Sequence, residues 1–88
     1  MKAYSTGIKM AVVTALQVYN FSPDVEVNSD ERGFTVKVTL NHLTDHMLGE
    51  IEKHVLFMSG QRIRSWDTFP THDGKLILIL EIEKRDEA

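Results

Sequence analysis

The chain has 88 residues, of which 42% are hydrophobic and 26% are charged, and its formal net charge is −3. These proportions are typical of one small globular domain, so we expect a single domain over residues 1–88, with an ordered core at about 5–84 and a short charged tail at 84–88. The absence of cysteine excludes disulfides, thiolate catalysis, iron–sulfur ligation and cysteine-based zinc sites. No stretch approaches the roughly 20 apolar residues that a membrane span needs, and we expect a cytoplasmic protein without a membrane partner.

The first half of the chain predicts a helix followed by two strands. Apolar residues recur at three- and four-residue steps within residues 7–20, as on one face of a helix. Pro23 ends this helix, because proline biases the residue before it away from the helical conformation. Apolar and polar residues then alternate at 25–28 and at 34–40, on either side of turn residues at 29–33, which predicts a hairpin.

The second half repeats that order of elements. Thr44 is a good N-cap, and Asp45 follows it in the first turn, where a negative charge suits the helix dipole. We therefore expect a helix over residues 45–58, then a less regular strand at 63–69 and a long turn. Residues 76–82 are apolar on both faces, which is typical of a central strand.

Helix–strand–strand twice over predicts an α+β fold of αββαββ order, with a four-stranded antiparallel sheet and two helices on one face. Moving the last strand to the front converts this order into the ferredoxin-like order, so we predict a circularly permuted ferredoxin-like sandwich. The two most apolar strands, 34–40 and 76–82, would lie side by side at the centre, with 25–28 and 63–69 at the edges. The residues that we expect to share one core are Val36, Val38, Ile51, Val55, Leu78 and Leu80.

Three potential metal ligands recur at four-residue steps on the second predicted helix. His46, Glu50 and His54 would form one stripe along it, and two imidazoles with a carboxylate are ordinary ligands of zinc or non-haem iron. Adjacent members lie about one turn apart, however, and a compact site rarely takes all three ligands from one straight helix. We therefore interpret the stripe as a solvated polar face, and we predict no metal and no other cofactor.

The strand at 63–69 carries a second candidate surface. Arg62, Arg64 and Trp66 alternate, which places them on one face of a regular strand, and Lys37 would share that face. If the strand contains a bulge, Trp66 would turn inward instead. Arginines and an aromatic ring on a sheet are how some single-strand-binding proteins hold phosphates and stack bases. The net negative charge argues against this use, because phosphate contacts need a surplus of Lys and Arg. A nucleic-acid-binding regulator is therefore the alternative hypothesis.

The leading hypothesis concerns an apolar patch on the helix-free face of the predicted sheet. Ile77 and Ile79 would point to that face, and exposed apolar patches often mark association surfaces. A second copy can cover such a patch by reusing it across a two-fold axis. The interaction face that we predict consists of Ile77, Ile79, Trp66, Arg62, Arg64 and Lys37. The function that follows is a small non-catalytic interaction or regulatory module, which forms a homodimer or binds a protein partner.

Enzyme chemistry has little support in the sequence. Ser59, His72 and Asp73 are residue types found in hydrolytic triads, but nothing in their spacing favours that role. The segment 59–61 lacks the glycine pattern of a phosphate-binding loop. We therefore predict that the protein is not an enzyme.

Overall fold

The computed structural model describes residues 2–19 and 23–83. The elements follow the predicted order, namely α1 (Lys2–Gln17), β1 (Asp24–Ser29), β2 (Gly33–Leu40), α2 (Asp45–Ser59), β3 (Ile63–Pro70) and β4 (Leu76–Glu83). Helix α1 begins earlier than predicted, and it ends at Gln17 because the chain turns at Tyr19, whose N–H donates to the carbonyl of Leu16. The predicted tail at 84–88 lies outside the described residues. Within the described ranges, neither helix is long and apolar enough to cross a membrane.

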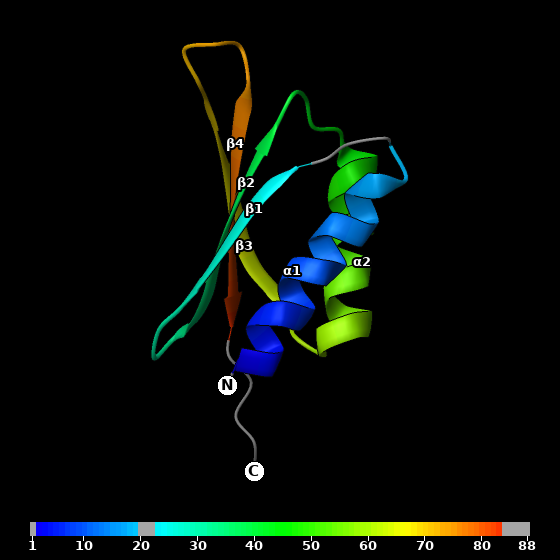
Figure 1. The fold of residues 1–88 in the computed structure, drawn as a ribbon, viewed down its shortest axis with the longest axis vertical. Coiled ribbons are helices and arrows are strands. Elements are labelled where there is room, and N and C mark those ends of the chain that lie inside the picture. Colours follow the sequence, from blue (N-terminus) through cyan, green and yellow to red (C-terminus); the bar gives the residue numbers. More distant parts are fainter. Residues whose placement is uncertain (1, 20–22, 84–88) are drawn as a thin grey trace.

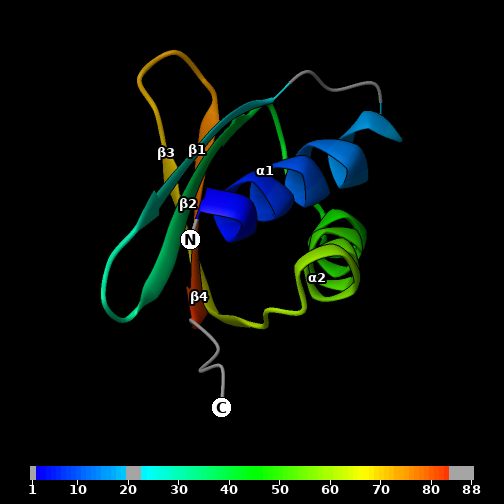
Figure 2. The same ribbon diagram turned by 60° about the horizontal axis from the view of Figure 1, so that its bottom comes forward.

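Both helices lie on one face of a four-stranded antiparallel sheet (Figure 1). The strand order is β1-β2-β4-β3, so β2 and β4 are central and β1 and β3 are the edges. Figure 2 shows the same two layers from another side, with α1 and α2 packed together and neither helix on the opposite face of the sheet. We call that opposite side the helix-free face. The predicted α+β fold is confirmed, and the sheet order is the one that the permuted ferredoxin-like arrangement predicts.

The core lies between the helices and the sheet. Alternate residues of the two central strands point toward the helices, with Val36 opposite Leu80 and Val38 opposite Leu78. None of these four side chains has exposed surface. The six residues predicted to share one core do so. The buried hydrophobic residues are Ile8, Ala11, Val12, Ala15, Leu16, Val25, Phe34, Val36, Val38, Leu40, Met47, Ile51, Val55, Leu78, Leu80 and Ile82.

Side-chain and glycine caps define the two ends of α2. Thr44 is the N-cap, and its Oγ1 accepts a hydrogen bond from the backbone N–H of Met47 at 3.2 Å. Gly60 at the other end has φ of 72°, and its N–H donates to the carbonyl of Leu56. Glycine suits this left-handed position because it has no Cβ to clash with the backbone. With both ends fixed by these caps, α2 packs its buried face against the sheet.

Replacing Thr44 with alanine is expected to lower the free energy of unfolding by about 0.5–2 kcal/mol, because the N–H of Met47 loses its acceptor. Urea titration followed by circular dichroism measures the change. Thr14, an exposed threonine within α1, provides the matched control. Its replacement by alanine should leave stability unchanged or slightly raised, since alanine is the better helix former. Equal losses at the two positions would mean that the cap bond contributes nothing.

Candidate interaction surface

An inserted residue in β3 decides which side chains reach each face of the sheet. Ile63 pairs with Ile82, and Ser65 pairs with the adjacent residue Glu81, so Arg64 is an extra residue in β3. Such a β-bulge reverses the side-chain alternation of a strand relative to its partner. Side chains beyond Arg64 therefore point to the opposite faces from those expected for a regular strand.

Trp66 lies on the helix-facing side of the sheet, which is the alternative that a bulge allows, so it does not share a face with Arg64. It pairs with Leu80, which is buried beneath the helices, and paired residues share a face. Arg64 instead reaches the helix-free face, where its guanidinium donates to the carboxylate of Glu81 at 3.1 Å. Arg62 precedes the bulge and borders a groove beside α2. The bulge thus places Arg64 on the opposite side of the sheet from Trp66.

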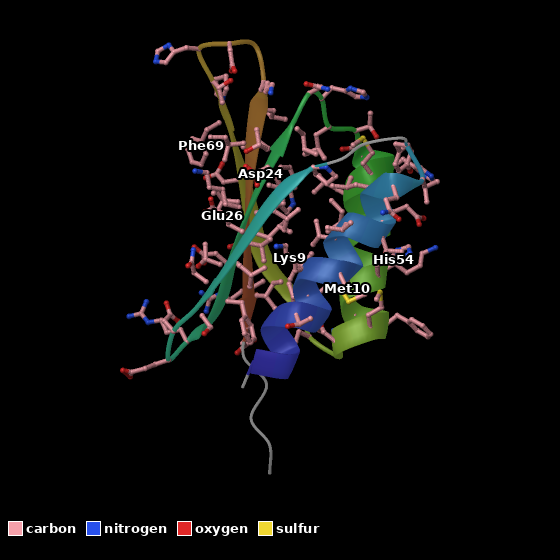
Figure 3. The ribbon with its side chains drawn as sticks, in the orientation of Figure 1. Lys9, Met10, Asp24, Glu26, His54 and Phe69 are labelled. Carbon is pink, nitrogen blue, oxygen red and sulfur yellow. The ribbon has the colours of Figure 1, made fainter. Side chains whose placement is uncertain are left out.

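Three rows of paired side chains cross the helix-free face from β1 to β3. The rows are Asp24, Thr39, Ile77 and Phe69; Glu26, Lys37, Ile79 and Asp67; and Asn28, Thr35, Glu81 and Ser65. Phe69 therefore lies beside Ile77, with Ile79 in the next row, and these three residues form the apolar patch. Phe69 is 49% exposed, whereas the two isoleucines are partly buried. Figure 3 shows Phe69, Asp24 and Glu26 on the side of the sheet away from the helices.

Acidic groups outnumber basic groups on the helix-free face. The three rows hold four carboxylates and one amine, and the bulged Arg64 adds a second cation. The Arg64 guanidinium is bound to Glu81, whose carboxylate also accepts from the hydroxyl of Ser65 at 3.4 Å. In the strand register, Lys37 lies opposite Glu26 of β1 and opposite Ile79 of β4. A phosphate backbone would therefore meet net repulsion at this face.

The candidate metal ligands of α2 make other contacts. The ring of His46 packs edge-on against the ring of Tyr19, with 6.1 Å between the centroids. Nδ1 of His54 donates to the backbone carbonyl of Glu50 at 2.8 Å, and the Glu50 carboxylate lies 3.3 Å from the amine of Lys53. Among the residues that the structure describes, no three His, Cys, Asp or Glu side chains are grouped so as to hold a metal ion.

The triad residue types are also far apart. Ser59 is the last residue of α2, and its hydroxyl donates to the carbonyl of Val55 at 2.6 Å. His72 and Asp73 lie in the β3–β4 turn, at the opposite end of the molecule (Figure 1). There the hydroxyl of Thr71 donates to the carboxylate of Asp73, and this bond lowers the pKa of Asp73. The side chains therefore shape local turns and caps.

Phe69 is the surface residue that sequence reasoning missed. One signal of the bulge was present in the strand. If β3 were regular, Asp67 would share the face of Ile63 and would direct a carboxylate toward the helices. That conflict indicates an inserted residue between these two positions, which turns Asp67 and Phe69 to the helix-free face.

Comparisons with protein-family models, with curated proteins and with solved structures find no match to this chain.

Proposed function

We propose that the protein is a small non-catalytic interaction module that self-associates through its helix-free face. The observation that supports this proposal is the apolar patch of Phe69, Ile77 and Ile79, which extends from a central strand to the sheet edge. Apolar area exposed to water is unfavourable by roughly 25 cal/mol per Å², and a second copy removes it on both molecules at once. Lys37 and the surrounding carboxylates form a polar rim of mixed charge.

The size of the face sets the expected strength of association. Four strands about 4.8 Å apart, each six to eight residues long, span roughly 400–500 Å² of sheet. Two such faces in contact would cover roughly 800–1,000 Å², which is below the usual range for stable complexes. We therefore expect a weak dimer whose population depends on protein concentration.

Phe69 is the side chain to test, because it is the most exposed side chain of the apolar patch. Replacing Phe69 with serine is expected to weaken self-association by roughly tenfold, as for other central aromatic contacts. Sedimentation over a concentration series measures the dissociation constant. Phe57 provides the matched control, since it is 88% exposed on α2 and lies on the helix layer. Its replacement by serine should leave association unchanged. Equal effects at both positions, or a wild-type monomer at high micromolar concentration, would contradict the proposal.

The nucleic-acid alternative stays a prediction with weaker support. Its premise was one strand face that combined Arg62, Arg64 and Trp66, and the bulge places Arg64 on the opposite side of the sheet from Trp66. Salt dependence distinguishes the two functions. Phosphate-driven binding weakens steeply as salt rises, whereas association through an apolar face changes little.

A further inference from the structure

The outer edge of β3 has an unusual combination of exposure and length. Within the described part of the chain β3 pairs with β4 alone, and almost all of its residues are exposed. Three features protect this edge in part: Arg64 forms the bulge, Pro70 closes the strand, and the exposed Asp67 between them accepts a hydrogen bond from the backbone N–H of Thr68 at 3.1 Å. The other edge, β1, is shorter and carries the exposed carboxylates of Asp24 and Glu26. On its outer side, the stretch between the bulge and Pro70 has no neighbouring strand among the described residues.

A groove runs beside this edge on the helix-facing side. It measures about 420 Å³ and is lined by Gly49, Glu52, Lys53, Leu56, Arg62 and Ile63. A Cβ at Gly49 would meet nothing within 4 Å, so this part of the α2 wall is open. Trp66 lies further along the same side of β3 and is 53% exposed. An added strand would place alternate side chains toward the groove and Trp66.

The charges of the groove define the kind of strand that fits. Arg62 makes no ion pair with any described residue, whereas the amine of Lys53 lies 3.3 Å from the carboxylate of Glu50, whose side chain is 24% exposed. Glu52 is the only carboxylate among the lining residues, and Arg62 is the lining cation that has no carboxylate partner among the described residues. Acidic side chains are therefore favoured beside Arg62, and apolar side chains beside Trp66.

We propose that the β3 edge and this groove form a second binding site, which accepts an extended peptide segment of another protein carrying an acidic side chain next to apolar ones. The segment pairs its backbone with the free edge of β3, as in β-strand addition. Its acidic side chain contacts Arg62 and Lys53, and its apolar side chains cover Trp66. The site is separate from the helix-free face, because Trp66 and the groove lie on the other side of the sheet.

The single tryptophan of the chain gives a direct readout. Two capped peptides serve as probes, Glu-Thr-Val-Thr-Val-Thr-Glu and its counterpart with lysine in place of both glutamates. The glutamate peptide is expected to shift the emission of Trp66 to shorter wavelength in a saturable manner, because the ring leaves water. The lysine peptide should bind at least several-fold more weakly. A glutamate peptide N-methylated along the backbone should give no shift, since it cannot pair with β3.

Charge reversal in the protein completes the test. Arg62→Glu is expected to weaken binding of the glutamate peptide by roughly three- to tenfold, as for loss of a partly exposed ion pair. Lys53 is exposed on α2, so Lys53→Glu supplies a second variant if Arg62→Glu fails to fold. Lys9→Glu is the matched control, because Lys9 is exposed beside β1 at the far edge of the sheet. No shift of Trp66 emission with either peptide, or equal binding of both peptides, overturns the proposal.

Discussion

Replacing Leu78 with alanine is expected to lower the free energy of unfolding by about 2–5 kcal/mol, the usual range for truncating a buried leucine. Leu78 has no exposed surface and lies on central strand β4, between Val38 of β2 and Thr68 of β3. The helices cover it from above, so the cavity left by alanine has no route to collapse. A domain of this size has a total stability of only about 5–15 kcal/mol, so the loss is a large fraction.

Urea unfolding of wild type and Leu78→Ala, followed by circular dichroism, measures this difference. The midpoint should fall while the dependence on urea stays constant, because the same surface is exposed on unfolding. A loss below about 1 kcal/mol would show that the core around Leu78 is not packed as described.

Ile79, the next residue of β4, should affect self-association and not the fold when it is replaced. Replacing Ile79 with lysine is expected to leave the fold intact and to weaken self-association by roughly thirtyfold or more, which corresponds to a central contact of about 2 kcal/mol. Ile79 lies on the helix-free face, so the new ammonium group can reach water. Its cross-strand neighbours are Lys37 and Asp67, which repel and attract the added charge respectively. In a dimer the same charge would be buried against the patch of the second copy.

Sedimentation and circular dichroism together read this result. The expected outcome is a folded monomer at concentrations where the wild type forms dimers. A variant that unfolds outright would place Ile79 in the core and contradict its assignment to the helix-free face. Dimerisation at the wild-type level would show that the second copy binds elsewhere.

The sheet order could be predicted because apolarity and position are physically linked. A central strand has a neighbouring strand on each side, and β2 and β4 are the most apolar of the four strands. The caps of α2 were also predictable, since Thr44 and Gly60 are residue types with specific roles at helix ends. The prediction began α1 at Gly7, after its observed start at Lys2, although Tyr4 stands four residues before Ile8 and continues the apolar spacing.

The interaction face was harder to predict, because its composition depends on a single inserted residue. Ile77, Ile79 and Lys37 follow from simple alternation, and the structure places them on the helix-free face as expected. Trp66 and Phe69 exchange faces because the bulge at Arg64 changes the register, and register depends on pairing with a distant strand. Local residue types carry only indirect information about that pairing.

The pairing of β2 with β4 has a consequence for how the chain folds. Each half of the chain supplies one helix and one hairpin, and an isolated hairpin is at best marginally stable in water. The two hairpins meet along β2 and β4, which pair continuously from Leu40 with Leu76 to Gly33 with Glu83, residues that are distant in sequence. Such non-local contacts slow folding, because the connecting segment must close before they form. On the ribosome, the first half therefore remains without its central partner until residue 83 has emerged.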